Sequence, residues 1–289
     1  MTETEKKRSA LIIYLSLHGT TRKAAEALCA SLMENGVPTD VYNLSEFKDK
    51  GDMEKLNTMI PSYPLIIFCS PTYFHHAPPL FTDFVKNIPD ATCDQAAAIL
   101  STFGGVYSGV IQFDLAKILY EKKYSLIGGI KVLTVHCLTF QEKKPFYEGH
   151  PDETDLTAIR EFGKQISIRL MNKNRQRYSP IAFKDKPFLL NFIDDHIHKM
   201  KNLTWAMPGI KVKGEKCTGC GLCVKNCPAN NITLEQTAVH GKDCTFCYSC
   251  VKICPSGATK SFLKPAAPAV KWLAKIFARY EEQTTQQVV

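Results

Sequence analysis

Apolar and polar positions alternate in blocks along the first half of the chain. Short apolar runs of strand length are separated by longer stretches in which apolar residues recur at helical spacing. In Thr21–Asn35, for example, Ala24, Leu28 and Leu32 share one face and Gly36 ends the pattern. Strands that alternate with helices are typical of an open parallel sheet. The predicted strands are Ala10–Leu15, Val37–Leu44, Leu65–Cys69, Ala96–Leu100 and Lys131–Cys137.

A last helix is predicted after Thr154, where Leu156, Ile159, Ile166 and Leu170 lie at helical spacing. The pattern therefore predicts an α/β fold, a doubly wound five-stranded parallel sheet. In such sheets, ligands bind outside the carboxyl ends of the strands. The loops that follow the strands are the place to look for a site.

The composition suits a well-cored chain of two domains, with 289 residues, 45% of them hydrophobic and 22% charged. No stretch approaches the roughly 20 apolar residues that span a bilayer. The N-terminus passes directly from charged residues into the first strand, without the apolar core of a signal peptide. We therefore expect a cytoplasmic protein without membrane association.

Eight of the twelve cysteines lie within 38 residues, from Cys217 to Cys254. In a chain without export signals, clustered cysteines are typical of metal ligands rather than of disulfides. The other four are scattered among apolar neighbours and are predicted to be buried small hydrophobic residues. These four are Cys29, Cys69, Cys93 and Cys137.

The eight clustered cysteines form two copies of the run Cys-x2-Cys-x2-Cys-x3-Cys-Pro. Two-residue gaps let three sulfurs converge on one cluster, and the three-residue gap turns the fourth toward the neighbouring cluster. Zinc ligands usually come as two separated pairs instead. The segment resembles bacterial two-cluster ferredoxins, which implies two [4Fe–4S] clusters with crossed ligands. The ligand sets would be Cys217, Cys220, Cys223 and Cys254 for one cluster, and Cys244, Cys247, Cys250 and Cys227 for the other.

The loop after the first strand, residues 16–21, feeds directly into a helix. Hydroxyls and backbone N–H groups at a helix N-terminus form an anion site. Arg22 and Lys23 oppose the helix dipole but suit a neighbouring phosphate, and the lysine-terminated loop of triphosphatases is absent. The loop resembles the flavodoxin phosphate loop, Thr/Ser-x-Thr-Gly-x-Thr, from which His18 departs at the third position. An ordinary capped turn would look similar.

Two further loops carry the same resemblance. Residues 70–79 resemble the flavodoxin-like loop that wraps the flavin ring, and residues 101–107 resemble the third flavin loop. Glycines there let the backbone approach the ring, and aromatic side chains can cover it. The residues implied to bind FMN are Ser16, Leu17, His18, Gly19, Thr20, Thr21, Ser70, Pro71, Thr72, Tyr73, Phe74, Ser101, Thr102, Phe103, Gly104, Gly105 and Tyr107. A domain of this fold without a ligand remains the alternative, because fold alone does not give function.

Residues 9–171 thus resemble flavodoxin and residues 209–260 a two-cluster ferredoxin, the order found in flavodoxin–ferredoxin fusion proteins of anaerobes. The resemblance implies an FMN-binding domain, a linker with a helix, a small α+β ferredoxin-like domain, and a C-terminal amphipathic helix and tail. The expected boundaries are 1–171, 172–208, 209–262 and 263–289.

The interpretation of the net charge of +8 depends on the charges of these cofactors. Residues 150–289 carry 21 Lys and Arg against 12 Asp and Glu, whereas residues 1–149 carry 15 against 16. Such a basic surplus can indicate nucleic-acid binding. Two oxidised clusters and a flavin phosphate, at about −2 each, would reduce the total to roughly +2. We therefore expect the basic residues to balance bound anions, and no nucleic-acid partner.

The resemblance implies an electron-transfer protein that passes electrons between two [4Fe–4S] clusters and FMN, linking one-electron ferredoxin-type carriers to two-electron flavin chemistry. One alternative is an FMN-dependent reductase of a small acceptor such as a quinone, a nitro compound or oxygen. The sequence contains no dinucleotide fingerprint and no dedicated substrate residues, so no catalytic residue is predicted. Another alternative is a binding protein whose ferredoxin part is structural. The expected partner is a redox protein or a small electron acceptor, and homo-oligomerisation stays open.

Five of the histidines outside the phosphate loop are predicted to have no role in metal binding or catalysis. His75 and His76 are expected to be polar loop tips, with proton transfer to the flavin as the alternative. His136 is expected within the fifth strand as a core residue. His196 and His198 are placed on a linker helix, with no metal role.

Two amphipathic helices are predicted near the second domain. The linker helix would begin at Pro187 and pack between domains through Phe188, Phe192 and Met200. The tail helix, Pro268–Glu281, is expected to pack on its own chain rather than on a membrane. Its basic side holds Lys271, Lys275 and Arg279, and its apolar side Val270, Leu273, Phe277 and Tyr280. The basic stretch 173–177 is expected to be solvated.

Overall fold

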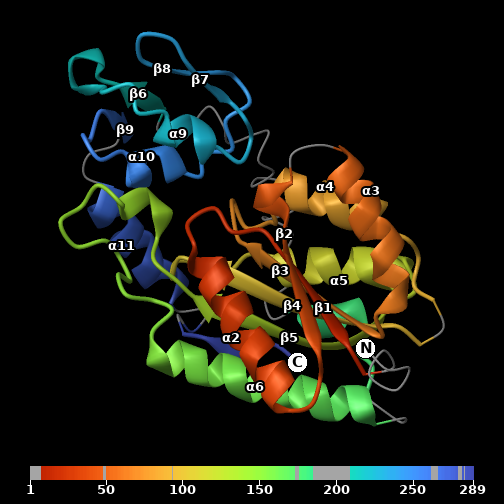
Figure 1. Cartoon of the computed structure of the whole chain (residues 1–289). Helices are drawn as coiled ribbons and strands as arrows, with labels where there is room; N and C mark the ends of the chain where they lie inside the picture. Colours follow the sequence, from red (N-terminus) through yellow and green to blue (C-terminus); the bar gives the residue numbers. More distant parts are fainter. Residues whose placement is uncertain are drawn as a thin grey trace.

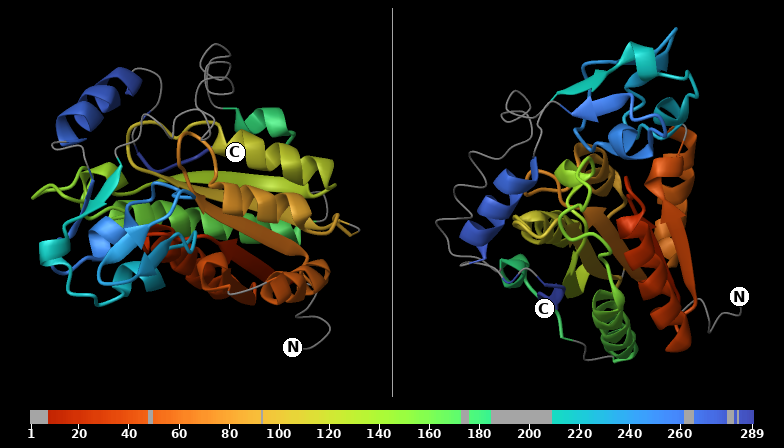
Figure 2. Two further views of the ribbon diagram at one scale, coloured as in Figure 1. Left: turned by 90° about the horizontal axis from the view of Figure 1, so that it is seen from above. Right: turned by 90° about the vertical axis from the view of Figure 1, so that its left-hand side faces the viewer.

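The computed structural model describes residues 8–47, 50–92, 94–172, 176–184, 209–261, 266–278, 282 and 284–289. They form a large sheet-and-helix body and a smaller cysteine-rich module, which is cyan and blue in Figure 1. Figure 2 shows the module at one end of the body in both further views. Among the described residues, no helix is long and apolar enough to cross a membrane.

The body is built on one sheet with the strand order β10-β5-β4-β3-β1-β2. Strands β1 to β5 pair in parallel, with one register irregularity between β4 and β5 at Ala97 and Ala98. This is the doubly wound arrangement that the alternating pattern predicts. The parallel strands are β1 (Ala10–Tyr14), β2 (Thr39–Asn43), β3 (Leu65–Pro71), β4 (Ala96–Phe103) and β5 (Ser125–Leu133).

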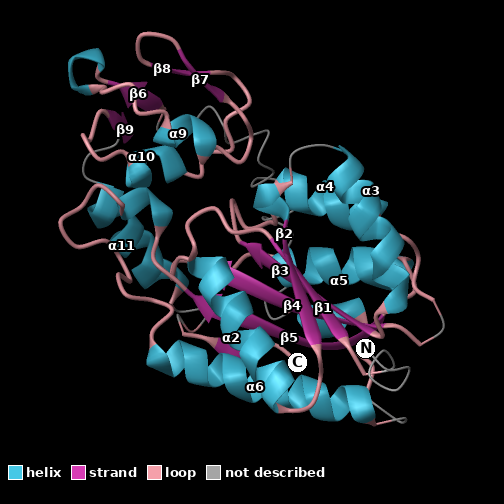
Figure 3. Cartoon of the chain, viewed as in Figure 1, coloured by secondary structure: helices cyan, strands magenta, loops and turns pink. Residues whose placement is uncertain are grey.

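Helices cover both faces of the sheet, as Figure 3 shows. One apolar cluster joins a face of the sheet to α2 and α6, and a second joins the other face to α3, α4 and α5. Strands β1, β3 and β4 are buried throughout because both of their faces are covered. The helices are α2 (Thr20–Glu34), α3 (Lys50–Met59), α4 (Pro79–Asn87), α5 (Ile111–Glu121) and α6 (Glu153–Met171).

Strand β5 begins six residues before the predicted strand Lys131–Cys137. The prediction missed its first half because Gly128 and Gly129 interrupt the apolar run. Both glycines are required by packing: a Cβ on Gly128 would lie 2.6 Å from Ile166, and one on Gly129 would lie 2.5 Å from Gln112. His136 consequently lies beyond the strand, and the expectation that it belongs to the strand is wrong.

The sheet also gains a sixth strand that the sequence pattern did not predict. Residues Gln286–Gln287 form β10, which pairs antiparallel with β5. Gly129 donates a backbone hydrogen bond to Val289, and Val288 donates one to Gly129. The C-terminal tail thereby covers an edge strand that would otherwise present unpaired backbone groups.

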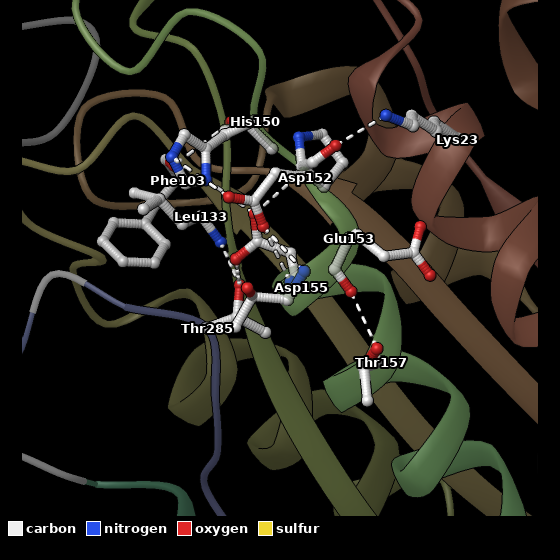
Figure 4. A network of polar contacts seen from close by, with 12 residues as sticks. Lys23, Phe103, Leu133, His150, Asp152, Glu153, Asp155, Thr157 and Thr285 are labelled. Carbon is white, nitrogen blue, oxygen red and sulfur yellow. Dashed lines mark hydrogen bonds and ion pairs between the residues drawn. The ribbon is translucent and has the colours of Figure 1, made fainter.

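A polar network at the start of α6 fixes this tail (Figure 4). Asp152 caps the helix by accepting the backbone N–H groups of Thr154 and Asp155. Asp155 accepts a hydrogen bond from the Thr285 hydroxyl of the tail, and its other oxygen lies 2.6 Å from His150 Nδ1. These groups are close enough to hold a metal ion, but capping and tail binding already engage their polar atoms.

The cysteine-rich module contains two antiparallel strand pairs and two short helices. Its elements are β6 (Ile210–Val212), α9 (Leu222–Lys225), β7 (Ile232–Leu234), β8 (Ala238–His240), α10 (Ser249–Ile253) and β9 (Thr259–Ser261). Helix α11 (Ala266–Phe277) follows and packs on the body through Phe277, which stacks on Tyr107. The tail helix therefore packs on its own chain, as expected.

Several predictions concern residues outside the described ranges. They are the linker helix from Pro187 with Phe188, Phe192 and Met200, the histidines His196 and His198, residues 173–175 of the basic stretch, Cys93, and Arg279 and Tyr280 of the tail helix.

Candidate cofactor sites

A cavity of about 360 Å³ opens at the carboxyl ends of the parallel strands. Its volume falls in the range of small-molecule and cofactor pockets. The loops after β1, β3, β4 and β5 line it, together with residues from the module and from α11. We call it the flavin cavity. The predicted residues that line it are His18, Thr20, Pro71, Thr72, Tyr73, Phe74, Thr102, Phe103, Gly104 and Tyr107.

The other residues implied to bind FMN lie behind or beside this cavity. Ser70 and Ser101 are fully buried within β3 and β4. The Thr21 hydroxyl is also buried, 2.9 Å from the Thr102 hydroxyl, so that it links the start of α2 to the end of β4. Ser16, Leu17 and Gly19 line a second, polar cavity of about 540 Å³ between the phosphate loop and the module. Gly105 has a left-handed backbone and packs against Tyr147.

The phosphate loop has the shape of an anion site. Gly19 adopts a left-handed backbone, φ 85°, immediately before α2 begins at Thr20. The Ser16 hydroxyl accepts the backbone N–H of Arg22 across the loop, at 3.0 Å. The basic side chains are directed elsewhere: Arg22 pairs with Glu26, and Lys23 donates to the backbone carbonyl of Pro151, 2.6 Å away. Anion binding here would therefore rely on hydroxyls and on the helix N-terminus.

Thr72 in the cavity wall carries a buried polar atom that bears on the fit of a ligand. The Thr72 hydroxyl is buried and has no hydrogen-bond partner among the residues that the structure describes. A buried hydroxyl without a partner is costly, and this one belongs to a residue that lines the flavin cavity. A hydrogen-bonding ligand such as the ribityl chain or the phosphate of FMN would satisfy it. The residues present therefore fit the cofactor.

The loop after β3 is held in a strained shape. Phe74 and His75 have left-handed backbones, with φ of 48° and 70°. The backbone of His75 lies against Gly109, where a Cβ would come within 2.2 Å. The His75 ring lies edge-on to Tyr107, at 4.6 Å, and lines the flavin cavity. His76 instead pairs with Asp114 at 2.6 Å. Strain of this kind is concentrated at ligand sites.

Three parts of the cavity wall were missed by the sequence analysis. The loop after β5, residues 134–138, contributes a wall that includes His136, whose ring would contact a Cβ at Gly104. Burial lowers the pKa of His136 to about 4, so its ring is neutral at physiological pH. The other two parts are Phe246 of the module and Leu273 and Phe277 of α11. The rule that ligands bind at strand ends could have identified the β5 loop, but no local signal marks the distant residues.

The eight cysteines of the module surround two separate hollows. Cys217, Cys220, Cys223 and Cys254 line the first, which we call the outer hollow. Cys227, Cys244, Cys247 and Cys250 line the second, the inner hollow. Each hollow therefore takes three cysteines from one run and the fourth from the other. Four thiolates around one space match the ligand set of a [4Fe–4S] cluster.

Backbone groups support these sulfurs. The N–H of Asn231 donates to Cys227 Sγ at 3.3 Å, and that of Phe246 donates to Cys244 Sγ at 3.4 Å. Burial raises the pKa of the Cys250 thiol. Burial acts in the same direction on Cys254, but hydrogen bonds from Thr259 and its neighbours lower the pKa of that thiol to about 7. Iron binding would replace the thiol protons, so loading couples to proton release.

The scattered cysteines are less uniform than predicted. Cys69 is buried in β3, whereas Cys29 and Cys137 are partly exposed. Cys137 lines the flavin cavity. Burial raises the pKa of its thiol to about 12, so it remains protonated at physiological pH.

Comparison with known protein families gives matches to two separate parts of the chain. The family described as NADPH-dependent FMN reductase matches residues 9–138, and the 4Fe-4S dicluster domain matches residues 215–258. With the parallel sheet and the two cysteine-lined hollows, these matches define an iron–sulfur flavoprotein of the electron-carrier class, with FMN and two [4Fe–4S] clusters as its cofactors. In this order of domains the chain is similar to fusions of a flavodoxin-like domain with a two-cluster ferredoxin domain.

An uncharacterized protein of Methanocaldococcus jannaschii is 26% identical over 161 residues, 56% of this chain and 36% of that protein. The matched region thus spans about a third of the curated relative. Among solved structures, a flavodoxin from the domain Archaea is 17% identical with a TM-score of 0.44, covering 57% of this chain and 99% of its own. Flavodoxin 1 from Bacillus cereus has 19% identity, a TM-score of 0.44 and the same coverages. The NADH:FMN oxidoreductase EMOB has 14% identity, a TM-score of 0.46, and coverages of 60% and 95%.

Proposed function

We propose that the protein transfers electrons between an external one-electron carrier of the ferredoxin type and FMN, by way of the two clusters. The observation that carries this proposal is the shared wall of the flavin cavity, to which Phe246 of the module contributes. Phe246 is one of the two residues between Cys244 and Cys247, which are members of the inner hollow. A cluster ligand loop that borders the flavin cavity suits direct exchange between the cofactors.

We assign the four cysteines that line each hollow as the ligands of one cluster. The outer hollow would hold one cluster and the inner hollow the other, with the fourth ligand exchanged between the two cysteine runs. The loops after β1, β3 and β4 would hold FMN, with Thr20 and Thr72 toward its phosphate and ribityl chain and Tyr73 and Tyr107 beside the ring. The proposed domain boundaries remain 1–171, 172–208, 209–262 and 263–289.

Reduction of FMN takes two electrons and up to two protons, whereas each cluster passes one electron at a time, so two equivalents of the one-electron carrier balance one FMN. The residues of the chain itself would bind the cofactors and shield them from water. The aromatic side chains Tyr73, Phe103 and Tyr107 are nearly fully buried, which limits contact between the cavity and bulk water.

The alternative is a reductase that passes electrons from FMN to a small acceptor, as the name of the FMN reductase family suggests. The position of α11 argues against an open substrate face. Phe277 stacks on Tyr107 with ring centroids 4.7 Å apart, and Leu273 lines the same cavity. A small acceptor would have to displace this helix to reach the ring.

Two kinds of measurement test the proposal. Anaerobically purified protein should contain about eight iron, about eight acid-labile sulfide and one FMN per chain, and stepwise reduction should bleach both chromophores reversibly. Zinc in place of iron, or purification without bound flavin and no uptake of added FMN, would overturn it. Saturable turnover of a quinone by the wild-type protein, unchanged when Phe277 is replaced by Ala, would favour the reductase.

The flavin assignment can be tested at Thr72. The variant Thr72→Val keeps the shape of the side chain and removes the hydroxyl, so FMN should bind about tenfold more weakly. Thr21→Val is the matched control, because its hydroxyl faces Thr102 rather than the cavity. It should lower the thermal midpoint more than the FMN affinity. Unchanged affinity in Thr72→Val would remove Thr72 from the site.

A further inference from the structure

The two cysteine runs are copies of one another, yet their corresponding positions differ in a consistent way. Gly219 and Gly221 of the first run correspond to Phe246 and Tyr248 of the second. All four backbones are left-handed, with φ of 67°, 70°, 51° and 58°. Glycine adopts this conformation freely, whereas bulky residues do so only under strain. The second run therefore keeps two aromatic residues where its own copy shows that glycine suffices.

Strain of this kind persists only where surrounding contacts compensate for it. Phe246 lines the flavin cavity. Tyr248 is only 2% exposed and lies close enough to Cys137, in the cavity wall, for the two groups to interact electrostatically. At Gly219, by contrast, a Cβ would meet nothing within 4 Å. The aromatic residues of the second run are thus used for contact with the flavodoxin-like half.

Polar contacts show the same asymmetry. Ser249 donates from its hydroxyl to the backbone carbonyl of Leu17 at 2.6 Å. Lys252 donates to the carbonyl of His18 at 2.9 Å. Both acceptors belong to the phosphate loop. The residue that corresponds to Ser249 in the first run is Leu222, which is 38% exposed.

His18 completes this contact from the flavodoxin-like side. Its Nδ1 lies 3.2 Å from the Ser249 hydroxyl and its Nε2 lies 2.7 Å from the Tyr73 hydroxyl. Because Ser249 has a single proton and gives it to Leu17, we assign Nδ1–H as donor to Ser249 and Nε2 as acceptor from Tyr73.

We propose that the second cysteine run is the flavin-side half of the module and that His18 is the positioning residue that holds it there. The departure of His18 from the flavodoxin loop pattern then has a physical reason: an imidazole can reach the module on one side and a flavin-loop tyrosine on the other. The inner hollow adjoins the flavin cavity, and the outer hollow is the one that an external redox partner meets. This inference rests on the proposed function.

The exposure of the cysteines agrees with an inner hollow next to the flavin cavity and an outer hollow open to a redox partner. Cys247 and Cys250 of the inner hollow are 7% and 6% exposed. None of the four cysteines of the outer hollow is buried, and Cys220 is exposed. In Figure 1, α10 of the second run lies on the side of the module that faces the body, and β7 and β8 lie on the far side.

The first experiment compares two serines in equivalent settings. Ser249 and Ser256 each follow a cluster cysteine by two residues, with hydroxyl–sulfur distances of 3.4 and 3.6 Å. In cluster-loaded protein, Ser249→Ala should weaken FMN binding by about tenfold and increase amide hydrogen exchange in residues 16–21. Ser256→Ala should change neither. Lys252→Gln, with Lys216→Gln as its charge-matched control, should give the same contrast.

His18 is tested by chemical rescue. In His18→Ala the phosphate loop should exchange faster and FMN should bind more weakly, and added imidazole should restore both. A residue that only fills space would be rescued equally by a non-hydrogen-bonding ring of similar size, such as cyclopentane, and that result would overturn the positioning role.

The second experiment tests the order of the hollows. The double variant Cys217→Ser/Cys220→Ser removes the outer set, and Cys244→Ser/Cys247→Ser removes the inner set. After one-electron reduction by a laser flash, flavin bleaching should keep its fast phase in the outer variant and lose it in the inner variant. Equal behaviour of the two variants, together with equal behaviour of the two serine variants, would overturn the inference. Protein that takes up no iron or no FMN would instead overturn the proposed function.

Discussion

The flavodoxin-like half of the chain buries its sheet between two apolar clusters of 23 and 20 buried residues, whereas the apolar cluster of the described module has three buried members, Ile232, Ala238 and Cys250. A unit of some 50 residues with so small a core usually needs a disulfide or a metal to fold. Here the hollows lined by cysteines take the place of that core. From this comparison we expect the larger part to fold by burying apolar surface and the module to fold by binding its cofactors.

Removal of iron should produce the largest difference in stability between the two parts of the molecule. Oxidative removal of the clusters with a chelator should unfold the module, because the free energy of metal binding is also its folding free energy. The flavodoxin-like half should keep its fold and bind FMN with reduced affinity, since only the docking contacts are lost. Hydrogen exchange on intact protein would measure this, with protection retained in β1, β3 and β4 and lost in residues 209–261. Simultaneous loss of protection in both halves would show that they form one cooperative unit.

The next largest effect is expected from single ligands that cross between the runs. In Cys227→Ser the inner cluster should be lost, although three of its ligands lie in the second run. In Cys254→Ser the outer cluster should be lost. Iron analysis should give about four atoms per chain in each variant, and the FMN affinity should fall only in Cys227→Ser, because the inner hollow adjoins the flavin cavity. Loss of the cluster formed by the same run would contradict the crossed arrangement.

The fold of the larger half follows closely from its pattern because buried parallel strands are continuous apolar runs. The exceptions have specific causes. Gly128 and Gly129 concealed the first half of β5, since their role is to admit side chains from α5 and α6. β10 has only two residues, Gln286 and Gln287, and its place depends on backbone pairing rather than on side-chain pattern. Pairing between distant segments leaves no periodic signal.

The candidate site could be predicted from the sequence to a similar degree, and the prediction missed residues for similar reasons. Local motifs identified three loops of the flavin cavity and all eight cysteines of the hollows. They did not identify Phe246 or Phe277, which reach the cavity from other parts of the fold. His18 stood out in the sequence as a departure from a pattern, but its partner Ser249 lies 231 residues away. A departure from a motif shows in the sequence which residue is unusual, but only the structure shows which residues that side chain contacts.

A smaller effect is expected from pH, and it concerns the flavodoxin-like half. Burial lowers the pKa of His136 from 6.5 to about 4. The unfolded chain therefore binds a proton between these values that the folded chain does not, so stability is greatest above pH 6.5 and falls as the pH drops toward 4. The loss should reach about 3 kcal/mol at pH 4. In His136→Asn, whose amide oxygen can still accept the N–H of Leu138, denaturant titrations should show a flatter pH profile. An unchanged profile would assign the acid sensitivity to another group.

The smallest predicted effect separates backbone strain from contact in the module. Phe246→Gly removes a left-handed aromatic residue and should relieve about 1 kcal/mol of strain, while opening the wall of the flavin cavity. Gly219→Ala is the converse in the first run: it adds a Cβ to a left-handed backbone that has open space around it, so it should cost about 1 kcal/mol and leave FMN untouched. Denaturant titration of the cluster-loaded module and FMN titration give the two quantities. If Phe246→Gly binds FMN as tightly as the wild type, the aromatic residue does not serve the flavin side, and the difference between the two cysteine runs would need another cause.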